Sequence, residues 1–259
     1  MPNAPDGRPA PRVGLLVTCL VDAIRPRIGF AAVQLLEEAG CVVEVPEAQT
    51  CCGQPAFNSG GTEAANMLAR QVIEAFEPYD FLVVPSGSCA GMIRVHYPEA
   101  LAGDAAWAAR ARALAAKTYE ILSFLADVRG YRPKGRSLAA TGTYHDSCAG
   151  LRELDVHAQP RKLLAAVAGL EMTRLDGADV CCGFGGTFCV KYPAISNAIV
   201  DEKAAAIERT GAGLLLAGDL GCLMNMAGRL NRRASAVRCF HTIEVLAGMA
   251  DGPAIGEEA

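Results

Sequence analysis

The sequence predicts an α/β fold of two tandem, pseudo-symmetric Rossmann-like units, each a small parallel sheet flanked by helices. Two observations carry this prediction. The cysteine order C, CC, C occurs twice, and each cysteine of the second copy follows its counterpart by 129 to 133 positions. In both copies, short β-rich runs alternate with amphipathic segments. A repeat of this period indicates a duplicated unit, and we expect one half over residues 1–130 and the other over 131–259.

The strands are expected in short apolar runs. These are VGLLVT, CVVEV and FLVVP in the first half, and SLAATGTY, LEMTRL and GLLLAG in the second. Between the first-half strands, apolar residues share one helical face from Ile28 to Leu36 and again from Ala65 to Phe76. Strands that alternate with helices imply right-handed parallel crossovers and a sheet covered on both faces. A further helical pattern from Ala105 to Arg129 predicts a long helix that joins the halves.

The repeated cysteines all follow the carboxyl ends of expected strands. In an open parallel sheet these ends share one edge, where such folds bind ligands. We therefore expect four thiols to meet in each half, and a glycine after each CC pair to let the backbone turn tightly. The expected sets are Cys19, Cys51, Cys52 and Cys89 in the first half, and Cys148, Cys181, Cys182 and Cys222 in the second.

Metal binding is the chemistry that this cysteine pattern favours. The chain has eleven cysteines and an N-terminus without the features of a secretory signal, so we expect a reducing, cytoplasmic setting in which disulfide frameworks are rare. Four thiolates suit a [4Fe-4S] cluster or a structural zinc ion. Zinc sites usually take ligands in C-x₂₋₄-C pairs, which these sets lack, so iron-sulfur is favoured and zinc stays open. Thiol-disulfide chemistry at the CC pairs would leave Cys19 and Cys89 without a role.

Composition and motifs argue against several other classes of partner. Although 51% of the residues are hydrophobic, no apolar run approaches the roughly 20 residues of a transmembrane helix. A net charge of −4 without a basic block argues against nucleic acid as a partner. No G-x-G-x-x-G follows a first strand and no Walker lysine is present, which argues against a nucleotide site.

The remaining cysteines and two histidines are expected to have lesser roles. We interpret Cys41 and Cys239 as small buried hydrophobic residues, and we leave Cys189 out of the ligand sets because the first half has no counterpart to it. For His145 and His241 we expect a hydrogen bond to a cluster sulfur or to the backbone rather than direct ligation.

Several motifs resemble the cysteine-rich CCG-domain family, which includes a subunit of heterodisulfide reductase and the iron-sulfur subunits of glycolate oxidase. They are the two CCG units, GTYHDSC at 142–148 and CCGFGGTF at 181–188. The stretches GFAAVQLLEEAGC, VPEAQTCCGQPAFNSG, YHDSCAGLREL and HTIEVLAG are similar to the lactate utilization protein A branch of that family.

This resemblance implies the A component of a three-protein system that oxidises L-lactate to pyruvate. The chain would be a non-catalytic electron-transfer subunit with one [4Fe-4S] cluster in each half, working with a second iron-sulfur protein and a third subunit. The alternative is a zinc-stabilised structural or assembly module of the same or a related oxidoreductase complex.

One departure from the family pattern affects both sites. The family ends each half with CxxC, whereas Ser86 and Asp219 stand at the first of those positions here. With one thiolate fewer, each site fits an ordinary [4Fe-4S] cluster better than the larger non-cubane cluster of the heterodisulfide-reductase relatives. Ser86 or Asp219 could instead supply an oxygen ligand or a hydrogen bond.

Overall fold

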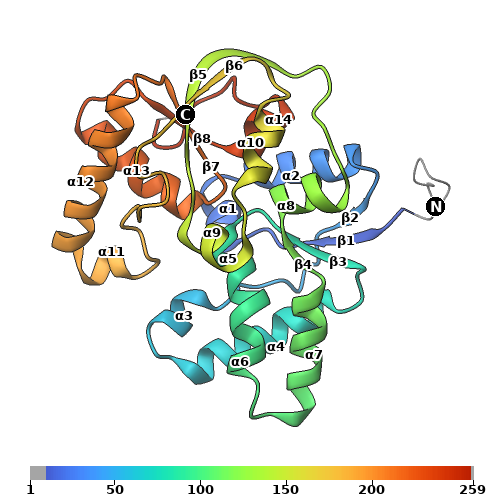
Figure 1. Cartoon of the computed structure of the whole chain (residues 1–259). Helices are drawn as coiled ribbons and strands as arrows, with labels where there is room; N and C mark the ends of the chain where they lie inside the picture. The colour runs from blue at the N-terminus through green and yellow to red at the C-terminus, as the bar shows by residue number, and fades with distance from the viewer. Residues whose placement is uncertain (1–9, 258–259) are drawn as a thin grey trace. The chain divides into compact units, whose positions relative to one another are not determined.

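The computed structural model describes residues 10–257 of the chain (Figure 1). Its internal contacts divide the chain into two compact units, Met1–Tyr131 and Arg132–Ala259. The prediction that the N-terminus is not a secretory signal concerns in part residues 1–9, which lie outside the described range. The assignment of one site-bearing domain to residues 1–130 and one to 131–259 stays a prediction.

The first unit is built on a parallel sheet with the strand order β2-β1-β3-β4. Its strands are β1 (Arg12–Leu15), β2 (Val42–Glu44), β3 (Phe81–Val84) and β4 (Thr118–Glu120). The two helical faces expected from the sequence belong to α2 and α4, and their apolar residues, such as Leu35 and Ile73, are fully buried. The helical segments are α1 (Cys19–Ile24), α2 (Arg27–Glu38), α3 (Gln54–Asn58), α4 (Thr62–Phe76), α5 (Gly87–Gly91), η1 (Met92–His96), α6 (Tyr97–Ala100), α7 (Ala105–Ala116), α8 (Ile121–Ser123) and η2 (Phe124–Val128).

The second unit repeats this arrangement with the order β6-β5-β7-β8, again all parallel. Its strands are β5 (Ser137–His145), β6 (Ala168–Thr173), β7 (Leu214–Ala217) and β8 (Arg238–His241). Its helices are α9 (Cys148–Leu154), α10 (Ala158–Leu164), α11 (Phe188–Lys191), α12 (Pro193–Arg209), α13 (Leu220–Arg232) and α14 (Thr242–Ala247). Because the strands of the two sheets correspond one to one in chain order, the predicted fold class is confirmed.

The prediction of one long helix from Ala105 to Arg129 is wrong. Helix α7 ends at Ala116. Strand β4 follows at Thr118 and pairs in parallel with β3, with Thr118 opposite Leu82. The Thr118 hydroxyl donates to the carbonyl of Leu114, which ends the helix, and a Glu120 carboxylate oxygen accepts from the Ser123 amide to begin α8. The segment therefore completes the first sheet.

None of the helices within residues 10–257 combines the length and the apolar character that a membrane span requires.

Candidate metal centres

In the first unit, the four predicted ligand cysteines come from three separate segments at the carboxyl edge of the sheet. Cys19 is the first residue of α1, Cys51 and Cys52 lie between β2 and α3, and Cys89 lies in α5 after β3. The Sγ atoms of Cys19 and Cys51 are 3.9 Å apart. Cys51 also contacts Cys52, and Cys52 contacts Cys89 through their sulfur atoms. The four thiols thus form one connected group.

The second unit brings its four predicted ligands together in the same order. Cys148 begins α9, Cys181 and Cys182 lie between β6 and α11, and Cys222 lies in the first turn of α13. Cys181 contacts both Cys148 and Cys182 through sulfur, and Cys182 contacts Cys222. All eleven cysteines of the chain lie in the described residues and are free thiols. Both groups therefore have their sulfurs available.

The glycine of each CCG unit fixes the position of the preceding thiol. Gly53 has φ +85° and Gly183 has φ +82°, a left-handed conformation that favours glycine. In this conformation the Gly53 amide donates to Cys51 Sγ at 3.5 Å, and the Gly183 amide donates to Cys181 Sγ at 3.3 Å. Hydrogen bonds of this kind stabilise negative charge on a thiolate. In each unit, the CCG sequence therefore stabilises the thiolate form of its first cysteine.

A second pair of hydrogen bonds holds the carbonyl group of the other cysteine. The Tyr97 hydroxyl donates to the Cys52 carbonyl at 2.7 Å, and Asn225 Nδ2 donates to the Cys182 carbonyl at 2.8 Å. The two residues come from different helices and are chemically different, so the repeat alone does not predict them. They restrain the CC pairs independently of any metal.

The charge state of each group of thiols favours a bound cation. A hydrogen bond from Cys19 is the largest effect that lowers the pKa of Cys51 to about 2, and a hydrogen bond from Cys148 does the same for Cys181. The contact with Cys51, followed by burial, raises the pKa of Cys19 above the ordinary range of a thiol. Like charges in one partly buried site repel, so the four thiols cannot all ionise unless positive charge enters. The donor set therefore fits a group that binds four thiolates, either a [4Fe-4S] cluster or zinc.

The residues that replace the family's additional cysteines are buried at the beginning of a helix. Ser86 precedes α5, and its hydroxyl accepts from the Cys89 amide at 3.4 Å. Asp219 holds the matching position before α13 and acts electrostatically on Cys222 and on His145. The Ser86 oxygen thus serves to orient the helix that carries Cys89.

The cysteines left out of the ligand sets have other surroundings. Cys41 and Cys239 are buried, and burial raises the pKa of the first to about 11 and that of the second to about 12. Both therefore behave as the small hydrophobic residues expected from the sequence. Cys189 Sγ donates to the carbonyl oxygen of Gly186 at 3.3 Å.

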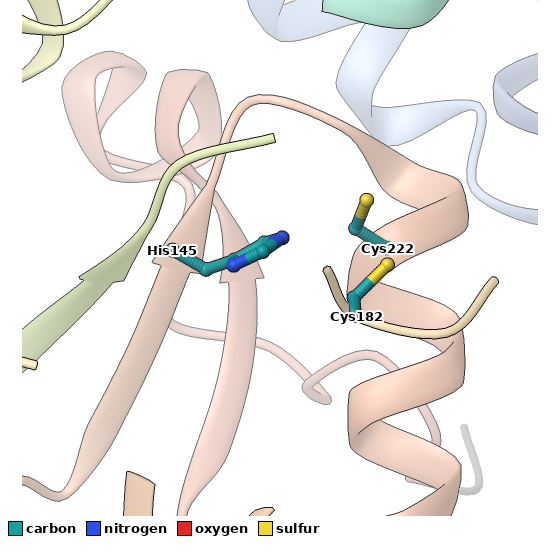
Figure 2. Close-up of side chains that lie close together, drawn as sticks. All are labelled: His145, Cys182 and Cys222. Atoms are coloured by element: carbon teal, nitrogen blue, oxygen red, sulfur yellow. The ribbon is translucent and has the colours of Figure 1, made fainter. Parts of the chain in front are cut away.

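His145 is the residue of the second site whose position the sequence did not show. It ends β5, its side chain is fully buried, and its ring points toward the sulfurs of Cys182 and Cys222 (Figure 2). One ring nitrogen and the two sulfurs all lie within 4.8 Å of one another. Burial, followed by the charge of Lys203, lowers the pKa of His145 to about 4. The sequence signal was its place three residues before a ligand cysteine, at the end of an expected strand.

The expected backbone hydrogen bond of His145 is present. Its Nδ1 lies 3.0 Å from the carbonyl oxygen of Ala178. Lys203 Nζ donates to the same segment, at 2.5 Å from the carbonyl oxygen of Gly177. The loop that leads into Cys181 and Cys182 is thus held by two buried cationic or polar side chains.

Comparisons with known proteins agree with this geometry. The family described as "CCG: Cysteine-rich domain" matches residues 13–94 and 142–227. Lactate utilization protein A of Geobacillus kaustophilus is 48% identical over 235 residues, which are 91% of this chain and 98% of the relative. The Bacillus subtilis protein of the same name is 47% identical over the same shares. Lactate utilization protein A 2 of Bacillus cereus is 44% identical over 236 residues, again 91% and 98%.

Among solved structures, a hypothetical protein from Helicobacter pylori is similar in fold. The TM-score is 0.66 at 12% sequence identity, and the match covers 97% of this chain and 50% of that one. The chain thus spans half the length of that structure. At this identity the likeness supports the fold alone.

Proposed function

Because the chain belongs to the cysteine-rich CCG-domain family, and within it to the lactate utilization protein A group, we propose that it is an iron-sulfur electron-transfer component of a multi-subunit complex that oxidises L-lactate to pyruvate. The halves 1–130 and 131–259 each hold one [4Fe-4S] cluster. The eight candidate ligands are Cys19, Cys51, Cys52, Cys89, Cys148, Cys181, Cys182 and Cys222.

The single observation that carries this proposal is the convergence of four free thiols at the same edge of each sheet. Three separated segments contribute to each group, and the two groups use the same order of elements. A bound [4Fe-4S] cluster supplies one-electron redox chemistry, at a potential set by hydrogen bonds to sulfur and by solvent exposure.

The chain's own residues set those conditions. The amides of Gly53 and Gly183 donate to one sulfur in each group. Cys52 is 4% exposed and Cys182 is 2% exposed, so part of each site is shielded from water. Cys19 is exposed, which leaves one side of the first site open to an electron-transfer partner.

Oxidation of lactate itself is assigned to the assembly and not to this chain. Removing two electrons and two protons from a hydroxy acid requires a base and an electron-pair acceptor beside the substrate, and here the thiols serve as ligands. The partners are the other subunits of the lactate-oxidising complex, including a second iron-sulfur protein. A reducing cytoplasm suits the free thiols.

A zinc-stabilised structural or assembly module is the second candidate. The observation that favours it is the buried group of His145, Cys182 and Cys222, because mixed cysteine and histidine donors are typical of zinc sites. Colour separates the two functions. Anaerobically purified protein with broad visible absorption that bleaches on addition of dithionite supports electron transfer, and a colourless protein with stoichiometric zinc supports the module.

Electron flow is tested in the assembled complex. Co-expression with the other two components should give a complex that oxidises lactate with an artificial acceptor, whereas this chain alone should not. Cys52→Ser or Cys182→Ser should lower turnover at least about tenfold, since loss even of a group that orients a ligand changes metal affinity or activity by about 10–100-fold. Cys41→Ser is the matched control and should leave turnover unchanged. Variants that lose iron yet oxidise lactate at the normal rate would replace this proposal with the structural module.

A further inference from the structure

One of the positions that the repeat makes equivalent offers a donor atom in the second site but not in the first. Three residues before its first ligand cysteine, the first half has Leu16 and the second half has His145. Both side chains are fully buried; His145 is the last residue of β5, and Leu16 directly follows β1. Leucine offers no donor atom, whereas imidazole offers two nitrogens.

The hydrogen bond at Nδ1 fixes which nitrogen carries the proton. The Ala178 carbonyl oxygen, 3.0 Å away, can only accept, so Nδ1 must be the donor. In the neutral ring Nε2 then carries a lone pair. Histidines that bind metals almost always donate their other ring N–H to a carbonyl or carboxylate in this way. The backbone thus presents His145 in the form that a metal ligand requires.

The lone pair of Nε2 lacks a partner in the protein. This atom is buried and has no hydrogen-bond partner among residues 10–257. Nearly all buried polar atoms in proteins are satisfied, so an unsatisfied one points to a missing ion, ligand or water. One ring nitrogen of His145 lies within 4.8 Å of the sulfurs of Cys182 and Cys222, and the ring points toward these sulfurs (Figure 2).

We propose that His145 Nε2 is a nitrogen ligand of the metal group in the second half, which makes that site a mixed cysteine-histidine site and the first an all-cysteine site. This inference rests on the proposed function, because it presupposes a metal group at the second thiol set. The second site then has five donors, one more than a group with four ligand positions needs.

Two consequences follow from the additional donor. A neutral imidazole in place of a thiolate removes one negative charge, and histidine ligation of this kind raises the potential of iron-sulfur centres. In addition, one thiol of the second set becomes replaceable. Cys148 and Cys181 both lie outside the close group of His145, Cys182 and Cys222. Because the Gly183 amide holds the sulfur of Cys181, Cys148 is the thiol whose loss His145 can offset.

Pulsed EPR on the dithionite-reduced protein tests the nitrogen ligand directly. The chain is produced with ¹⁵N-labelled histidine and purified anaerobically. We expect a ¹⁵N hyperfine coupling in the spectrum of the reduced protein. His145→Leu, which installs the residue of the first half, should abolish it. His157→Leu, at a half-exposed histidine of the same unit, should leave it unchanged.

Iron content gives a second readout that does not depend on the spectrum. Cys19→Ser should lose about half of the iron, as expected for loss of one of two equal clusters, while Cys148→Ser should keep nearly all of it. The double variant Cys148→Ser/His145→Leu should then lose about half of the iron, as Cys19→Ser does.

The possible failures can be told apart. A wild-type protein with iron in both halves but no ¹⁵N coupling overturns the ligand assignment and leaves the proposed function in place. The same conclusion applies if the coupling survives in His145→Leu, or if Cys148→Ser loses as much iron as Cys19→Ser. A second half that binds no metal group at all overturns both the assignment and the proposed function for that half.

Discussion

Alanine substitution at the two CCG glycines should have unequal effects on stability. Both positions have positive φ, and the left-handed conformation costs about 1–2 kcal/mol for a residue with a Cβ. At Gly53 the added Cβ would meet no atom closer than 3.4 Å. At Gly183 it would lie 2.8 Å from the carbonyl oxygen of Ser196, a backbone atom of α12 that cannot rotate away. Overpacking of this kind adds about 1–3 kcal/mol.

The expected loss of unfolding free energy is therefore about 1–2 kcal/mol for Gly53→Ala and about 2–5 kcal/mol for Gly183→Ala. A second loss adds to the larger figure, because moving the peptide weakens the hydrogen bond from Ser196 Oγ to the Gly183 carbonyl, now 2.8 Å long. Both variants keep every cysteine, so the comparison isolates the backbone.

Urea unfolding of the metal-free, reduced protein measures this difference. Circular dichroism follows both units, and the fluorescence of Trp107, the single tryptophan of the chain, follows the first unit. We expect the larger loss of unfolding free energy for Gly183→Ala. Equal losses for the two variants, or a larger loss for Gly53→Ala, would refute the reasoning from the Cβ contacts.

Three further predictions concern buried groups. Arg161→Ala should lower the unfolding free energy by about 2–3 kcal/mol, because it leaves the 2% exposed Asp146 carboxylate without its bidentate partner. Arg110→Ala, which removes an exposed ion pair, is the control and should cost at most about 1 kcal/mol in the same urea titration. Cys239→Ser should destabilise the protein by about 1–3 kcal/mol by burying a hydroxyl in an apolar environment, while iron content stays at the wild-type value. The pKa of His145, lowered to about 4, lies below that of an unfolded histidine, so the unfolded state takes up the proton first as the pH falls. Relative to His145→Leu, the metal-free protein should therefore lose about 2 kcal/mol of unfolding free energy from about pH 7.5 to about pH 5. A stability difference between the two proteins that stays the same across that range would contradict the lowered pKa of His145.

Much of the fold follows from patterns in the sequence, because the cysteine repeat and the apolar runs independently indicate the same α/β unit in each half. Three strands of each sheet and two buried helical faces were predicted in this way. The fourth strand of each sheet was missed. Thr118–Glu120 is only three residues long and lies between apolar residues at helical spacing, so periodicity alone favours a continued helix. Pairing with β3, a tertiary contact, decides the outcome.

The convergence of the thiols was predictable for a different reason. Carboxyl ends of parallel strands share one edge, so chain order and cysteine position suffice. The role of His145 was not predictable in the same way. Its place before Cys148 is visible in the sequence, but the direction of its ring depends on the Ala178 carbonyl, which belongs to a loop 33 residues away.

The central claim is that the clustered thiols of each half hold one iron-sulfur cluster. Iron and acid-labile sulfide, counted on anaerobically purified protein, test it most directly. One [4Fe-4S] cluster in each half predicts about eight iron and eight sulfide per wild-type chain. Cys51→Ser/Cys52→Ser and Cys181→Ser/Cys182→Ser should each retain about four of both, because each double variant removes the ligands of one half only. Stoichiometric zinc in place of iron, or an iron content that neither double variant lowers, would contradict the account.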